Sequence, residues 1–381
     1  ARIDVGQDNL KQAVESGAGL YALTYEAQRL STLNVSGGLR LETAHRTNFG
    51  WAMPRVRVEY RQHLDRDQNA VIGYADQPAG TRYGLTGIDS ARNSLLVGLG
   101  ADFLLSDGFK IGIDYQTVRA FGGEQGHGLR LWVSKELDGK GLPRGLTETR
   151  LPDDPVQLDF SVLWDDNLNR AREDAEKLSD RIHSLTASKR LVFPFTERTR
   201  GTLTGFLSGD KAYTYSGYDR AGGGVQGELQ YRTSAEFDAV TFALNGRAVF
   251  EDFASDIRSG KRYSFGINAR QSWTDRIDAF VAVTRNFRDA RSIVFDGRDT
   301  SARFNLDYAL GQHSSFYAGG EYRRGDQVTT APVSLSYAAL AKATVADDVY
   351  GAAGLQAYRY DARTRIWTVG FNYALGSRDS I

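Results

Sequence analysis

The sequence of 381 residues contains no cysteine, one methionine and only seven prolines. The lack of cysteine excludes thiolate metal sites, and it suits a chain that crosses an oxidising compartment unfolded, where stray thiols would pair wrongly. The scarcity of proline suits long β-ladders, because proline cannot donate a ladder hydrogen bond. No apolar run approaches the roughly 20 residues that a transmembrane helix needs, so a helical membrane protein is excluded.

The chain also lacks a net charge, since 47 basic residues balance 47 acidic ones. Nothing therefore indicates a nucleic-acid partner, which would require a basic excess. The mean hydropathy of −0.42 is that of a polar chain. It nevertheless carries 41 glycines, 19 tyrosines and 19 phenylalanines.

The segment from Thr364 to Leu375 reads TRIWTVGFNYAL and alternates between two faces. One face carries Trp367, Val369, Phe371, Tyr373 and Leu375. Alternation by itself predicts a half-buried β-strand. An apolar face this aromatic is typical of a lipid-facing strand in a membrane barrel. A strand of a secreted sandwich is the alternative.

The same alternation continues along the chain from Gly19. Within 55–61 and 303–308, for example, charged or amide side chains occupy one face and apolar ones the other. A soluble sandwich or propeller would also alternate, but it rarely sustains such contrasting faces over so many strands. The sequence therefore predicts an all-β fold, a transmembrane antiparallel β-barrel of about 18 strands, with 16 to 20 allowed. Its lumen-facing residues keep the average polarity high.

The domain organisation follows from where the alternation begins and pauses. Residues 1–17 predict a short N-terminal helix, a plug or linker, because Leu10, Ala13 and Val14 share a helical face. Residues 18–381 then predict one barrel: a first part (18–137), a linker or loop (138–155) and the remaining strands (156–381). Two barrels in series are the alternative, but an incomplete first barrel would leave open edges in lipid. The chain starts at Ala1 without a signal-like segment, so we expect a mature protein or the C-terminal part of a longer one.

The connections divide into short and long ones. Short connections at 273–276 and 310–313 predict periplasmic turns. Longer ones predict extracellular loops at 165–181, 208–224, 287–300 and 324–332. An even number of strands would return both ends of the barrel to the same side of the membrane.

Two parts of the sequence resemble known bacterial signatures. The spacing of Thr368, Gly370, Tyr373 and Leu375 is similar to the C-terminal targeting signal of outer-membrane proteins. Leu39 to Leu137 resembles the translocator domain of autotransporters, through GLRLE, WAMPRVRVEYR, ARNSLLVGLGADFLLSDGFKIGIDYQ and GHGLRLWV. In that family a barrel of fewer strands, with a helix in its pore, anchors an exported passenger. Here the barrel pattern continues for some 240 residues beyond Leu137.

The resemblance implies a location and partners. The location is the bacterial outer membrane, where the barrel would contact outer-membrane lipid and lipopolysaccharide. The barrel-assembly machinery and periplasmic chaperones would deliver it, and a passenger could lie upstream of Ala1. No cofactor is implied.

Charged residues predicted to face the lumen are the only candidate functional group. This charge cluster comprises Arg55, Arg57, Glu59, Arg61, Arg247, Arg270, Arg303 and Asp307. Its arginines could select anions or guide an anionic polymer. Alternatively, the charges pair with one another across strands.

Enzymatic and metal-binding functions find little support. The five histidines are scattered, no two lie close in sequence, and no metal-ligand spacing exists. We therefore expect no enzyme. The favoured function is an anchor and translocator for a surface-exposed N-terminal region. The alternative is a porin or export channel for small solutes or an anionic polymer, and an outer-membrane hydrolase is a distant third possibility.

Overall fold

The computed structural model describes most of the chain. The described residues are 2–10, 13–14, 23–25, 28–65, 69–74, 83–86, 93–105, 108–120, 125–136, 156–169, 177–311, 313–333, 338 and 341–373. Among them, no helix is long and apolar enough to cross a membrane.

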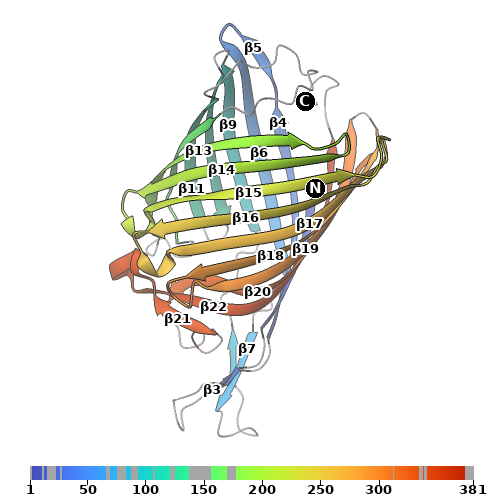
Figure 1. Cartoon of the computed structure of the whole chain (residues 1–381). Coiled ribbons are helices and arrows are strands. Elements are labelled where there is room, and N and C mark those ends of the chain that lie inside the picture. Colours follow the sequence, from blue (N-terminus) through green and yellow to red (C-terminus); the bar gives the residue numbers. More distant parts are fainter. Residues whose placement is uncertain are drawn as a thin grey trace.

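One antiparallel sheet of 18 strands dominates the molecule (Figure 1). Its first half contains β1 (Arg2–Leu10), β4 (Gln28–Glu42), β5 (His45–Thr47), β6 (Gly50–Asp65), β9 (Asn93–Leu105), β10 (Phe109–Ala120), β11 (Gln125–Glu136) and β12 (Gln157–Asp165). Its second half contains β13 (Asp180–Pro194), β14 (Thr199–Ala212), β15 (Arg220–Arg232), β16 (Thr241–Phe253), β17 (Gly260–Thr274), β18 (Ile277–Ala290), β19 (Gly297–Ala309), β20 (Ser314–Pro332), β21 (Ala343–Ala346) and β22 (Leu355–Tyr373). The prediction of an all-β antiparallel barrel is confirmed, and the strand number lies in the predicted range.

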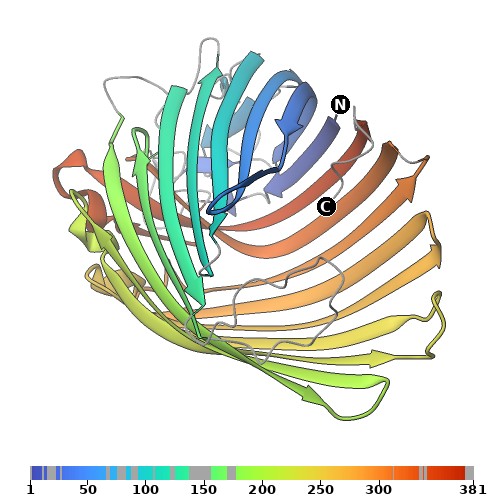
Figure 2. The same ribbon diagram turned by 90° about the horizontal axis from the view of Figure 1, so that it is seen from above.

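The sheet closes on itself through β1. This strand pairs with β22, Val5 lying opposite Trp367, and with β4, where Val5 lies opposite Leu33. Figure 2 shows β1, in dark blue, beside the red β22. Two of the 18 strands are additions to the ring: β5 prolongs the hairpin of β4 and β6, and β21 pairs only with β22. The remaining 16 strands form a closed ring, which leaves no unpaired edge.

The ring has a turn end and a loop end. At the turn end, hairpins as short as the two residues between β17 and β18 connect the strands, and β1 begins there opposite the C-terminal half of β22. The even number of strands in the ring places the start of β1 and the end of β22 at this same end, where Arg2 lies opposite Gly370. Long connections occur at both ends, since 20 residues separate β11 from β12 at the turn end and 14 separate β12 from β13 at the loop end.

The loop end carries additional structure. A second sheet of four short strands extends beyond it (Figure 1). These strands are β2 (Ala13–Val14), β3 (Leu23–Tyr25), β7 (Asn69–Tyr74) and β8 (Tyr83–Thr86). Three short 3₁₀ helices follow β14, β16 and β21: η3 (Ser216–Tyr218), η4 (Asp256–Arg258) and η5 (Asp348–Ala353).

The predicted N-terminal helix is wrong, because residues 2–10 form β1 and residues 13–14 form β2. The helical spacing of Leu10, Ala13 and Val14 was outweighed by pairing on both sides of β1. Without this strand, β22 and β4 would each expose a row of unpaired backbone groups, at a cost of several kcal/mol per group in lipid.

One predicted loop is also wrong. Residues 324–332 continue β20, and they pair with β22 as far as Pro332 opposite Leu355. The predicted turn at 273–276 is confirmed, since β17 ends at Thr274 and β18 begins at Ile277.

The two faces of the strands differ as the alternation predicts. Large apolar side chains remain exposed on one face of the ring from β4 round to β22, Leu39 by 72%, Phe265 by 59% and Trp367 by 52%. The register keeps this face continuous, since Ile267 lies opposite Leu244 on one side and Val283 on the other. This apolar face meets lipid, and the opposite face lines the lumen.

Candidate functional site: the charged lumen wall

The first lumen cluster is centred on Arg55. In the register, Arg55 of β6 lies opposite Gly100 of β9, which lies opposite Asp114 of β10. The guanidinium crosses Gly100 and donates to Asp114, with Nη2 2.5 Å and Nε 3.1 Å from Oδ1. It also donates to Asp102. A Cβ at position 100 would lie 2.5 Å from the Asp114 carboxylate, so glycine is what allows this pairing across three strands.

The rest of the predicted basic row on β6 is paired as well. Glu59 accepts from Nη2 of Arg57 at 2.5 Å and from Nη2 of Arg61 at 3.0 Å. The side chain of Glu59 is only 12% exposed. Because charge-assisted bonds hold all three arginines of the row, they provide a rigid, locally compensated wall.

A second lumen cluster lies near the loop end. Arg220 donates to Asp210 and to Glu251, both at 2.5 Å, and Nε of Arg262 is 2.6 Å from Glu251. Arg220 was not among the predicted lumen residues, because 208–224 was predicted to be a loop. In the structure β14 extends to Ala212 and β15 begins at Arg220. Continued alternation through Gly222 and Gly224 was the signal that could have located it.

The other four residues of the predicted charge cluster lie on β16 to β19 and do not join the β6 row. Arg247 stacks over Phe206, 4.9 Å from the ring centroid, and Arg303 lies 5.5 Å from that of Phe280. Arg270 is 3.7 Å from Asp278. Asp307 lies opposite Asp278 in the register. The predicted cluster therefore divides into the β6 row, which is paired, and four residues that form no ion pair with one another within the described residues.

A cavity of about 700 Å³ opens against the β6 wall. Arg55, Arg57, Asp114 and Arg130 are among its lining residues. Within the described residues, no group of three or more His, Asp or Glu side chains could hold a metal ion.

The connections at the loop end are tied together by buried polar contacts. Arg258 of η4 is 2.5 Å from Asp347, whose side chain is fully buried. The hydroxyls of Tyr218 and Tyr350 are 2.6 Å apart. Burial raises the pKa of Tyr350, and the hydrogen bond with Tyr218 raises it further. Three connections of different hairpins thus form one ordered unit.

The residues of the predicted targeting signal lie at the end of β22. Thr368 and Gly370 belong to the lumen face, and Tyr373 belongs to the apolar face, 64% exposed. The ring of Tyr317 on β20 occupies the space that a Cβ at Gly370 would need. Leu375 lies outside the described residues.

Comparison with known families identifies part of the chain. Residues 1–116 match the model of the Autotransporter beta-domain. This match overlaps the segment 39–137 in which the resemblance was noted, and it extends to the N-terminus. The matched domain is a translocator rather than a catalytic domain. No curated protein matches the sequence.

Solved structures resemble the chain only distantly. OccAB4 of Acinetobacter baumannii is 10% identical, with 97% of each chain covered and a TM-score of 0.43. OpdQ of Pseudomonas aeruginosa is 8% identical, with 97% of each chain covered and a TM-score of 0.41. OmpT of Vibrio cholerae, an outer membrane protein, is 10% identical, with 95% of this chain and 99% of that chain covered and a TM-score of 0.36.

The family match agrees with the closed ring, its exposed apolar face and its charged lumen, which are features of an outer-membrane barrel. The chain is a bacterial outer-membrane β-barrel whose first 116 residues match the autotransporter β-domain.

Proposed function

We propose that this barrel anchors and translocates a surface-exposed region attached to its N-terminus. Because β1 begins at the turn end, this region would pass back through the lumen to reach the loop end. The observation that carries the proposal is the match of residues 1–116 to the autotransporter β-domain, within a ring that encloses a charged lumen. We also propose that 18–381 acts as one barrel domain, together with β1, rather than as two barrels in series.

The lumen wall supports a conduit for a polypeptide. Arg55, Arg57, Arg61 and Arg220 each pair with a carboxylate, so these two parts of the wall are polar but have little uncompensated charge. Such a surface does not hold a passing chain of either sign strongly. In this proposal the delivery partners are the barrel-assembly machinery and periplasmic chaperones.

The test is export of an epitope fused ahead of Ala1. Intact cells expressing the fusion are treated with protease, and loss of the epitope is followed by immunoblot. The translocator predicts that external protease removes the epitope while the folded barrel survives. A matched strain with a disrupted outer membrane controls for access. An epitope that stays protected in intact cells, although the barrel is folded, contradicts translocation.

The alternative is a porin or export channel for small solutes or an anionic polymer. Arg247 and Arg303 favour it, because each stacks on an aromatic ring, and among the described residues neither lies within ion-pair distance of a carboxylate. Planar-bilayer conductance of the refolded chain tests this function. A steady anion-selective current that weakens in Arg247→Gln/Arg303→Gln would support the channel, and a silent bilayer would exclude it.

A further inference from the structure

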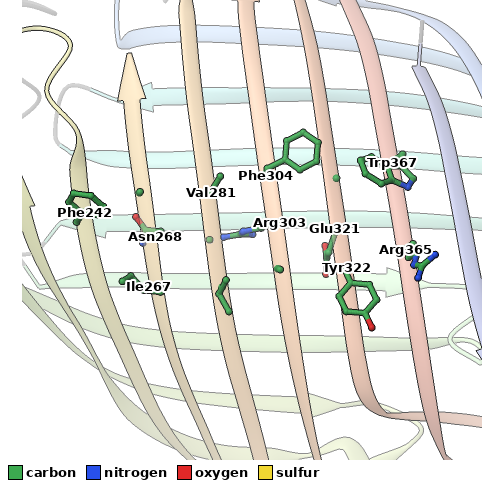
Figure 3. A pocket seen from close by; sticks show the side chains of 15 residues that line it. Phe242, Ile267, Asn268, Val281, Arg303, Phe304, Glu321, Tyr322, Arg365 and Trp367 are labelled. Atoms are coloured by element: carbon green, nitrogen blue, oxygen red, sulfur yellow. The ribbon is translucent and has the colours of Figure 1, made fainter. Parts of the chain in front are cut away.

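An apolar groove runs across the outer face of β16 to β20 and β22. It has a volume of about 560 Å³, which lies in the range of ligand pockets. Figure 3 shows Phe304 and Trp367 on one side of the groove, Tyr322 and Arg365 on the opposite side, and Phe242 at its far end. Ala302 lies in register between Val283 and Tyr322, and its short side chain leaves the groove open between these two larger ones. The groove therefore lies on the surface that meets lipid.

Four arginines on the same face gather where the groove approaches the loop end. Arg285 lies opposite Thr300, which lies opposite Arg324, and Arg324 lies opposite Arg363. Arg365 follows two residues later on β22 and so shares the face of Arg363. Arg285, Arg324 and Arg365 are exposed, and Arg363 is half-buried.

These four arginines differ from the paired arginines of the two lumen clusters. Arg55 and Arg220 each contact two carboxylates, whereas within the described residues none of the outer four has a carboxylate partner within 4 Å. Arg285 donates to the Thr300 hydroxyl. Arg324 and Arg363 are like charges directly opposite each other, which destabilises a sheet unless an anion lies between them.

We propose that this outer surface binds a lipid that carries phosphate groups, from the leaflet at the loop end. Its acyl chains would lie in the groove between Trp367 and Tyr322, and its phosphates would accept hydrogen bonds from the four arginines. Arginine suits this role because its planar guanidinium binds phosphate oxygens in a bidentate manner. The position fits a membrane-embedded ligand, since the cations border the apolar face instead of lying within it. The inference does not depend on the translocator function.

The test measures lipid retained by the full chain in detergent, using native mass spectrometry. The probes are lipid A, its soluble deacylated bisphosphorylated disaccharide, and phosphatidylcholine. The triple variant Arg324→Gln/Arg363→Gln/Arg365→Gln removes three of the cations. The matched control Arg46→Gln/Arg198→Gln/Arg276→Gln removes equal charge at the turn end. Folding of each variant is verified by heat-modifiable electrophoretic mobility.

We expect the unaltered chain and the control to retain lipid A, and the triple variant to bind it roughly tenfold more weakly or worse. Filling the floor with Ala302→Phe should weaken lipid A but leave the deacylated disaccharide unaffected. The proposal would be overturned if the triple variant bound lipid A as well as the unaltered chain does. It would also be overturned if the unaltered chain retained phosphatidylcholine or the deacylated disaccharide as well as it retains lipid A. A chain that sediments as a dimer and retains no lipid would instead assign this surface to a second copy.

Discussion

Arg258 and Asp347 form an ion pair of 2.5 Å across two connections of the loop end, and the Asp347 side chain is fully buried. Arg258 also stacks over Tyr218 and Phe295. Removal of the cation leaves an uncompensated carboxylate in a buried site. We expect Arg258→Gln to lower the free energy of unfolding by about 3–5 kcal/mol, measured by urea titration in vesicles.

The matched control for that pair is nearby. Arg291 pairs with Asp256, but the two side chains are 60% and 71% exposed. Arg291→Gln should therefore cost less than about 1 kcal/mol. Equal losses in the two variants would show that burial of Asp347 does not govern the stability of the loop end.

The assignment of the outer face is testable at single sites. Phe265 and Leu306 belong to the apolar face of β17 and β19, and Phe265 is 59% exposed. Phe265→Arg and Leu306→Arg should each cost about 2–4 kcal/mol if the site is near the midplane of the bilayer. Asn305→Arg, on the lumen side of β19, should change stability by no more than about 0.5 kcal/mol. If all three variants unfold alike, the faces have been assigned wrongly.

Gly370 is expected to stabilise the barrel because it leaves room for the aromatic ring of a neighbouring strand. The ring of Tyr317 lies where a Cβ at this position would be, an arrangement in which an aromatic side chain covers a glycine on the neighbouring strand. Gly370→Val should lower stability by about 1–3 kcal/mol in vesicles prepared without assembly proteins. The second change Tyr317→Ala should restore most of the loss. Failure of this rescue would indicate that Gly370 acts through something other than Tyr317.

The loop end should weaken in alkali. Burial and the Tyr218 hydroxyl raise the pKa of Tyr350 above the value of about 10 that tyrosine has in an unfolded chain. The associated stability is complete below that unfolded pKa and is lost as the pH rises towards the folded one. Spectrophotometric titration should show that Tyr350→Phe ionises as many tyrosines at pH 11 as the unaltered chain. One tyrosinate fewer in the variant would mean that Tyr350 titrates normally.

The alternation of Trp367, Val369, Phe371 and Tyr373 was sufficient to predict a lipid-facing strand, and all four are exposed on the apolar face of β22. This succeeded because a strand's faces are set by local period. The lumen position of Arg55 was predicted in the same way. Its partners were not, because Asp102 and Asp114 reach it only through the register of β6, β9 and β10.

The wrong structural predictions failed because pairing with distant parts of the chain decides these segments. The N-terminal residues were predicted to be helical because Leu10, Ala13 and Val14 have helical spacing. Their strand is fixed instead by β4 and β22, the latter more than 350 residues away in the chain. For the same reason 324–332 was predicted to be a loop, although β22 extends alongside it. The outer arginines escaped notice since Arg285, Arg324 and Arg363 meet only across strands.

Closure of the ring through β1 can be measured most directly by disulfide trapping. The chain has no native cysteine, so introduced pairs would be its only thiols. Gly6 lies opposite Ile366 of β22 and opposite Thr32 of β4, and such antiparallel pairs lie within disulfide reach. A closed ring predicts that Gly6→Cys cross-links with Ile366→Cys and with Thr32→Cys in separate variants, but not with Asn305→Cys. Absence of both cross-links from the folded protein would contradict the closed ring and would restore the helical plug as the arrangement to be tested.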